Sequence, residues 1–260
     1  VTSLADDAVA AAFSDKSLAR LQAPSWALAR TLGDGQDASL LAGRVLALAF
    51  HPRGHQLATG SGVPSRNGTI KLWDVHNGAA IKALDDAHGD TVTGLAFSPD
   101  GTRLASSASD RLVKVHRMED GELLHKLEGH TNHVLDAAWS ADGRTIASAG
   151  ADHVTKLWDA DTGKQKKSEG GFKKEVTTIE FLGTGESLLT GSGDRNVKAG
   201  GQNLGGNGGF VYSVDATPDG ATIVAGGEDG VLRIWQASDR KLMMSFPPPT
   251  RSTPSETAAR

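Results

Sequence analysis

The stretch "GHTNHVLDAAWSADGRTIASAGADHVTKLWD", residues 129–159, decides the fold of this chain. Taken alone, its His130, Ser148 and Asp152 suggest a hydrolase triad, because these residue types carry nucleophilic catalysis in many enzymes. The surrounding pattern indicates something else. Short apolar runs alternate with polar turns such as "SADG" (140–143), and Asp-Gly between two apolar runs predicts a β-hairpin. The stretch therefore predicts a series of short antiparallel strands.

The same pattern recurs along the chain. Apolar runs that open a unit start at Val1, Val45, Val92, Val134, Val176 and Val211, so units of about 42 residues continue to Phe246. Each unit contains four short strands separated by turns, which is typical of one blade of a β-propeller. The sequence therefore predicts an all-β propeller of four-stranded antiparallel blades over residues 1–246.

Three features of the opening stretch resemble the WD-repeat (WD40) signature: "GH" at 129–130, Asp152 and "WD" at 158–159. "LWD" recurs at 72–74, and "GHTNHV" and "FVYSV" are similar to WD-repeat regions of large bacterial proteins. The resemblance implies six blades. Because the family places the fourth strand of one repeat in the next blade, it also implies ring closure by "RKLMMSF" (240–246), paired with the blade that Val1 begins. An incomplete seven-bladed ring is the alternative.

Some units depart from the pattern. "GVPSRN" (62–67) lengthens one hairpin by four residues, and the first unit is compressed. In the fifth unit Gly200 stands at the tryptophan position, and "AGGQNLGGNGG" (199–209) is too short. Glycine weakens a strand, so the third and fourth strands of this unit are predicted to be stunted. Residues 247–260 are rich in proline and polar residues, which predicts a disordered tail or linker.

The triad residues repeat at fixed offsets, which indicates a structural role. The resemblance implies that they form a tetrad with a tryptophan, in which a buried chain of hydrogen bonds holds each blade together. Only the fourth unit carries all four members. The predicted tetrad residues are His130, Ser148, Asp152 and Trp158, with the partial sets His88, Ser106 and Asp110, Thr190 and Asp194, Asp229 and Trp235, and Trp73.

The resemblance also places two kinds of connection on one face, here called the top face: the loops before the first strands and the turns between the second and third strands. Loops of this kind carry function on a rigid scaffold. The predicted partner-binding residues are Arg66, Asp90, Arg111, His133, His153, Lys174, Glu175, Arg195, Phe210 and Glu228. His133 and His153 are metal-ligand types, but no third ligand is evident, so no metal is predicted.

Composition narrows the function classes. Lys and Arg number 27 against 31 Asp and Glu, a net charge of −4, which argues against binding to nucleic acid through phosphate contacts. Lysines 164, 166, 167, 173 and 174 form a local basic cluster, predicted to be a solvated face. The chain has no cysteine, which excludes disulfides and thiolate chemistry. No apolar run approaches the roughly 18–20 residues of a membrane span.

No phosphate loop, zinc-protease motif or nucleophile elbow is present. We therefore predict a non-catalytic scaffold that binds a protein or peptide, without cofactor, as a monomeric domain or as part of a longer chain. One alternative is a propeller enzyme with a metal or cofactor in its central channel, where Asp136, Glu180 and Asp215 supply acidic groups. Another is a docking or sensory domain of a larger bacterial redox-linked protein. The compartment stays open.

Overall fold

The structure is a computed structural model. It describes the backbone of residues 2–3, 8–12, 18–22 and 27–32, and residues 43–247 with their side chains. Strands, turns and bends make up this part of the chain, and it contains no helix. The predicted all-β class is therefore confirmed for the described residues. The predicted tail, residues 247–260, lies outside them except for Pro247.

Residues 43–247 form five four-stranded antiparallel sheets, with strands in sequence order. The first contains β5 (Arg44–Phe50), β6 (Gln56–Val63), β7 (Asn67–Asp74) and β8 (Ala80–His88). The second contains β9 (Val92–Phe97), β10 (Arg103–Ala108), β11 (Val113–Arg117) and β12 (Leu123–Leu127). The third contains β13 (Val134–Trp139), β14 (Thr145–Gly150), β15 (Thr155–Asp159) and β16 (Gln165–Glu169).

The fourth sheet contains β17 (Val176–Phe181), β18 (Leu188–Ser192), β19 (Val197–Ala199) and β20 (Gln202–Asn203). The fifth contains β21 (Val211–Ala216), β22 (Thr222–Gly227), β23 (Leu232–Gln236) and β24 (Leu242–Phe246). The strands β1 (Thr2–Ser3), β2 (Ala8–Ala12), β3 (Leu18–Gln22) and β4 (Ala27–Leu32) pair with one another in a further sheet.

The Asp-Gly turns form as the sequence predicts. Asp100 accepts hydrogen bonds from the Ser98 hydroxyl at 2.6 Å and from the Thr102 N–H at 3.0 Å. Gly101 follows with φ of +75°, in the left-handed region that favours glycine. Ser140 and Asp142 repeat the first of these contacts at 2.6 Å. Local turn chemistry thus fixes the hairpin between the first and second strands of these sheets.

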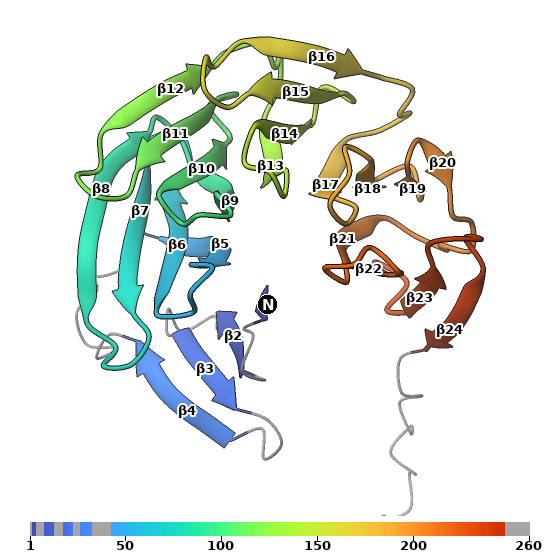
Figure 1. Cartoon of the computed structure of the whole chain (residues 1–260), viewed down its shortest axis with the longest axis horizontal. Helices are drawn as coiled ribbons and strands as arrows, with labels where there is room; N and C mark the ends of the chain where they lie inside the picture. The colour runs from blue at the N-terminus through green and yellow to red at the C-terminus, as the bar shows by residue number, and fades with distance from the viewer. Residues whose placement is uncertain (1, 4–7, 13–17, 23–26, 33–42, 248–260) are drawn as a thin grey trace, which may run out of the picture.

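The sheets follow one another around a common centre, with the first strand of each sheet innermost (Figure 1). Successive sheets pack face to face through small and branched side chains. Ala147 on β14, for example, belongs to the same buried cluster as Ile179 and Phe181 on β17. Burial on both faces explains why the second strands are almost continuously apolar or small. This arrangement is consistent with a β-propeller.

The predicted pairing of residues 240–246 with the unit of Val1 is wrong. β24 pairs with β23 of its own sheet, with Leu232 opposite Phe246 and Ile234 opposite Met244. Strands joined by a short turn pair locally because little chain entropy is lost in bringing them together. The fourth strand of every described unit therefore stays in its own sheet. Figure 1 shows β21–β24 and β1–β4 at the two ends of the arc of sheets.

Both described irregular units behave as predicted. The insertion at 62–67 extends the hairpin, so β6 and β7 each have eight residues and pair out to Val63 and Asn67. In the fourth sheet β19 has three residues and β20 has two. The outer part of this sheet is therefore stunted.

Candidate functional site

The complete tetrad lies in the sheet β13–β16. His130 Nδ1 lies 2.9 Å from Asp152 Oδ1, His130 Nε2 lies 2.8 Å from Ser148 Oγ, and Trp158 Nε1 donates to Ser148 Oγ at 2.9 Å. Asp152 also accepts the N–H of Thr131 at 2.9 Å. The chain of contacts ties the loop before β13 to the turn between β14 and β15 and to the indole on β15.

Burial decides the protonation state of this histidine. It lowers the pKa of His130, although the Asp152 carboxylate acts in the opposite direction. The neutral ring therefore donates from Nδ1 to Asp152 and accepts the Ser148 hydroxyl at Nε2, while that hydroxyl accepts from the indole. Gly150 leaves the space for this contact, because a Cβ there would lie 2.3 Å from the Asp152 carboxylate and 2.5 Å from His130 Nδ1.

The sheet β9–β12 contains the same network with one change. His88 Nε2 lies 2.8 Å from Ser106 Oγ, and Asp110 lies 3.0 Å from His88 Nδ1. His116 stands at the tryptophan position, and its Nδ1 is buried without a hydrogen-bond partner. Burial, together with the nearby His88 and Lys114, lowers the pKa of His116 to about 4. This histidine is therefore neutral in the folded protein at neutral pH.

The remaining sheets keep only parts of the network. The Trp73 indole donates to Thr59 Oγ1 at 3.0 Å, whereas Thr190 Oγ1 is buried without a partner.

The turn aspartates of the last two sheets have partners other than histidine. Asp229 pairs with Arg233 Nη2 at 2.7 Å, and this contact is the main reason that the pKa of Asp229 is about 2. Trp235 is buried at 1% exposure. Asp194 accepts the N–H of Lys173 at 2.9 Å instead of a histidine.

Sequence reasoning missed Thr59 and Arg233. Thr59 stands 14 residues before Trp73, whereas Ser148 stands 10 before Trp158, so the four-residue insertion hid the equivalence. Arg233 occupies an alternating position of β23, and nothing in its spacing marks it as the partner of Asp229.

The ten predicted partner-binding residues lie at one end of the sheets, because successive antiparallel strands bring their entry loops and second turns to the same edge. Asp90, Glu175 and Phe210 are half-buried. The exposed ones are Arg66, Arg111, His133, His153, Lys174, Arg195 and Glu228.

A depression of about 670 Å³ opens at the centre of this top face. His153, Glu175 and Phe210 line it together with Leu46, Leu135 and Tyr212, which the sequence analysis did not single out. Leu46 is 55% exposed and Tyr212 61%, and the Phe210 and Tyr212 rings lie 5.2 Å apart. The signal was present, since residues 46, 135 and 212 each follow the valine that opens a unit.

Two carboxyl groups of the inner strands, Asp136 and Asp215, act on a third, Glu180. Asp136 accepts N–H groups from Ile179 at 3.0 Å and Ala137 at 2.9 Å, yet burial raises its pKa to about 6. Burial raises the pKa of Glu180 to about 8, and the nearby Asp136 and Asp215 act in the same direction. The sequence suggested that these residues are scattered, but the fold brings them together. Among the described side chains, no group of three or more His, Asp or Glu residues is arranged to hold a metal ion.

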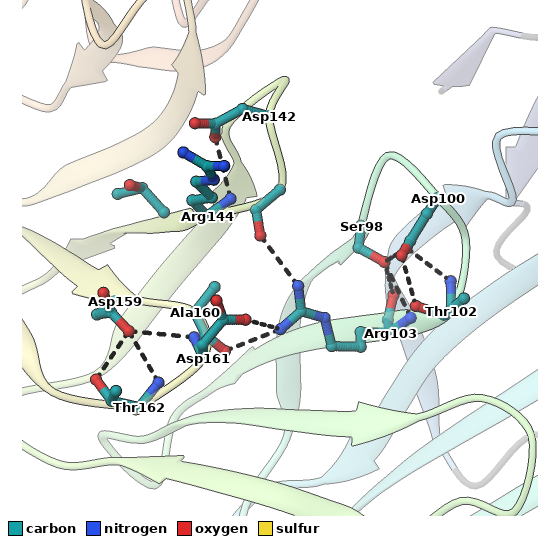
Figure 2. Close-up of polar contacts among 12 residues, drawn as sticks. Ser98, Asp100, Thr102, Arg103, Asp142, Arg144, Asp159, Ala160, Asp161 and Thr162 are labelled. Atoms are coloured by element: carbon teal, nitrogen blue, oxygen red, sulfur yellow. Dashed lines mark hydrogen bonds and ion pairs between the residues drawn. The ribbon is translucent and has the colours of Figure 1, made fainter.

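On the opposite face, one arginine contacts two neighbouring sheets. Arg103 on β10 donates to the Ala160 carbonyl and the Asp161 carboxylate of the next sheet, at 3.0 and 3.1 Å (Figure 2). It also donates to the Gly143 carbonyl at 3.0 Å, and its guanidinium lies 4.7 Å from the centre of the Trp139 ring. This one side chain therefore links two neighbouring sheets.

Comparison with known families agrees with the fold. The family model described as "WD domain, G-beta repeat" matches residues 37–74, 80–117, 121–159 and 201–236, more than half of the chain. The chain therefore belongs to the WD40 repeat family.

Individual relatives match parts of this chain in sequence. WD repeat and SOCS box-containing protein 1 of Homo sapiens is 41% identical over 80 residues, which cover 30% of this chain and 18% of that protein. Nuclear distribution protein PAC1 of Arthroderma benhamiae is 29% identical over 199 residues, 70% of this chain and 43% of that protein. Cilia- and flagella-associated protein 52 of Sus scrofa is 30% identical over 87 residues, which cover 34% of this chain and 13% of that protein. The chain thus spans less than half of each of these relatives.

These relatives are eukaryotic, so the comparisons do not support the resemblance to large bacterial proteins that the sequence suggested. The described part of the chain contains no helix with the length and apolar character to cross a membrane.

Proposed function

We propose that this chain is a non-catalytic protein-interaction scaffold whose partner binds the top face. The observation that carries the proposal is the central depression, where Leu46 and Tyr212 are more than half exposed beside Phe210. Large apolar side chains gathered in one exposed depression are typical of a binding site. Rigid sheets hold the surrounding loops, as in other loop-based binding sites.

Family membership supports the class of partner. WD40 domains generally bind proteins, and this chain belongs to that family. The SOCS-box protein and PAC1 match only part of their length here, so the proposal takes from them no named partner.

The burial of the tetrad supports a non-catalytic role. Ser148 is 0% exposed and its hydroxyl is engaged by both His130 and Trp158. A catalytic nucleophile must reach its substrate and lie free to attack. The tetrad residues are therefore proposed to hold the sheet together.

The test is capture of partners from the native cells with the purified chain as bait. Arg111, His133, Lys174 and Tyr212 are changed together to alanine, so that one variant alters both the loops and the depression. A matched variant away from the top face changes Arg117, Leu123, His125 and Lys126 to alanine. We expect the top-face variant alone to lose the captured protein. Capture retained by that variant would show that the partner uses another face.

For the architecture, we propose an open ring of blades, which corresponds to the incomplete seven-bladed ring named above as the alternative. Supporting it, Val224 of β22 is half-buried, whereas the residues at the same place in the other second strands described with side chains are 0% exposed: Ala58, Ala105, Ala147 and Leu189. Since the chain lacks cysteine, introduced pairs report proximity directly. We expect Leu232→Cys with Phe246→Cys to form a disulfide. Val224→Cys on β22 with a cysteine at Thr2 or Ser3 of β1 should not form one, although neighbouring sheets elsewhere meet through the second strand of one and the first strand of the next. A disulfide between β22 and β1 would indicate a closed ring.

A further inference from the structure

The outer strand β24 differs from the other outer strands in its side chains. Its sequence, "LMMSF" (242–246), contains no charged residue. β8, β12 and β16 lie at the same outer place in their sheets, and each carries charge, for example Lys82, Lys126 and Lys167. β20 has only two residues. Charged side chains and short length both prevent the free N–H and C=O groups of an edge strand from pairing with another chain, and β24 has neither protection.

Both faces of β24 are open to solvent. Met243 and Met244 point to opposite faces, because successive side chains of a strand alternate, and they are 58% and 51% exposed. Leu242 and Phe246 are 43% and 47% exposed. Large apolar side chains beside a free strand edge are typical of a surface that another chain covers.

The order of these side chains makes the strand complementary to itself. If two copies of β24 pair antiparallel about Met244, Leu242 lies opposite Phe246 and Met243 lies opposite Ser245. At the centre Met244 meets Met244 of the second copy. Apolar and aromatic side chains that lie directly opposite each other stabilise a pair of strands.

The strand β16 shows why the other outer strands do not pair in this way. Lys167 is the central residue of β16, so the same symmetric arrangement would place Lys167 opposite Lys167 of a second copy. Like charges directly opposite each other destabilise a sheet. Of these outer strands, β24 is therefore the one suited to pairing with itself.

Proline limits the length of the contact. Pro247 follows β24 directly, and prolines 248 and 249 come next in the sequence. Proline has no N–H to donate to a neighbouring strand, so the pairing ends at Phe246. A contact in which the same strand of both copies takes part closes on itself with two-fold symmetry, and it gives a dimer instead of a fibre.

We infer that β24 pairs antiparallel with β24 of a second copy, centred on Met244, so that the two β21–β24 sheets join into one continuous sheet. The symmetric match of side chains selects a second copy over a strand of unrelated sequence. This inference goes beyond the proposed function, because it uses neither the top face nor the gap in the ring. Two short strands form a small interface, so the dimer should dissociate on dilution.

The first test is sedimentation velocity of the full chain over a wide range of concentrations, where we expect a reversible equilibrium of monomer and dimer. Met244→Lys places two cations opposite each other at the centre of the pair. It should raise the dissociation constant roughly 10-fold or more. The matched control is Leu123→Lys on the edge strand β12, since Leu123 is also apolar and 45% exposed. This control should dimerise like the wild type.

Mixing two variants tests the register and excludes a simple folding defect. Met244→Lys and Met244→Glu should each be monomeric alone, whereas an equal mixture should recover the dimer, because opposite charges then face each other at residue 244. Met244→Cys should oxidise to a disulfide-linked dimer, since the chain has no other cysteine. Leu123→Cys should stay monomeric under the same conditions.

Several results would overturn the inference: a wild type that stays monomeric at every concentration, equal dimerisation of Met244→Lys and wild type, or a mixture that dimerises no better than its components. Assemblies that grow beyond the dimer would indicate a contact without two-fold closure. If Met244→Lys loses a protein captured from the native cells while the wild type is monomeric, a strand of another protein uses this edge. Each of these outcomes leaves the test of the top face unaffected, because that test compares other variants.

Discussion

His130 donates its Nδ1 hydrogen to Asp152 at 2.9 Å, although their side chains are only 1% and 7% exposed. The pair is therefore a neutral imidazole with a carboxylate, since burial keeps the pKa of His130 below its usual value. Each of the four tetrad side chains is satisfied by another, so removing one leaves a buried polar group without its partner.

The first prediction follows from that chain. His130→Ala should lower the free energy of unfolding by roughly 1–3 kcal/mol, the cost of leaving buried partners unsatisfied. Urea denaturation measures it, with the exposed His133→Ala as control. An unchanged denaturation midpoint for His130→Ala would show that the tetrad does not hold this sheet together.

The second prediction compares two buried threonines. Thr59 and Thr190 are 0% and 4% exposed, but only Thr59 accepts the hydrogen bond of a tryptophan. Thr59→Val should destabilise the fold by roughly 1–3 kcal/mol, whereas Thr190→Val should stabilise it by about 1 kcal/mol, because it removes an unsatisfied hydroxyl. Thermal and urea denaturation of both variants check the opposite signs. Equal losses would mean that both hydroxyls have a hydrogen-bond partner.

The third prediction concerns stability in acid. The unfolded chain protonates His116 near its ordinary pKa of 6.5, while the folded protein resists protonation down to about 4. Below pH 6.5 the unfolded state therefore binds more protons, and stability falls as pH drops from 6.5 toward 4, by roughly 2–4 kcal/mol.

Replacement by an aromatic residue that does not titrate isolates this effect. His116→Phe and His116→Trp should both remove it, and only the tryptophan can also donate to Ser106. The slope of unfolding free energy against pH is the measurement, because it is insensitive to uniform packing changes. His130, whose pKa burial also lowers, contributes to the slope in every variant. A slope as steep as that of the wild type in both variants would assign the acid sensitivity to groups other than His116.

The fourth prediction concerns Glu180. Its folded pKa of about 8 lies above the ordinary 4.5, so the folded state holds a proton that the unfolded state releases between these values. Stability should therefore fall as pH rises from 4.5 through 8. Glu180→Gln, which resembles the protonated acid, should flatten this part of the profile, whereas Glu186→Gln on the exposed turn should not. The same alkaline slope in Glu180→Gln and wild type would contradict the assignment.

The fifth prediction concerns the link between sheets. Arg103→Met should destabilise the fold by roughly 1–3 kcal/mol, because three acceptors and the Trp139 face lose their cation. Arg117→Met removes an exposed ion pair, and its melting temperature should barely change. If the two variants melt alike, Arg103 does not link the sheets energetically.

Much of this fold is local in origin. The Ser98–Gly101 turn, the Asp-Gly hairpins and the alternation within each strand are encoded within a few residues, so the units and most strand positions follow from sequence. The stunted β19 and β20 were also predictable, because glycine and a missing length are visible without a structure. The repeated spacing of His130, Ser148 and Asp152 indicated a structural role, and the resemblance to WD repeats implied their contact with Trp158.

Interactions between distant residues were not predictable in this way. The pairing of β24 was wrong in the sequence analysis because closure of a ring depends on how all the sheets pack, whereas a hairpin needs only its turn. Thr59 was hidden by an insertion, and Arg233 on β23 pairs with Asp229, where the complete tetrad has a histidine from the loop before the first strand. The effect of Asp136 and Asp215 on the pKa of Glu180 arises only when separate sheets meet at the centre.

The sequence by itself thus determined the period, the four-strand units and the residues that recur in them, because hydrophobic alternation and turn chemistry act over short range. Only the tertiary structure decided which of those residues share a surface. It placed Leu46, Leu135 and Tyr212, from three different sheets, around one depression beside His153. Their proximity depends on the packing of whole sheets, which no single unit encodes.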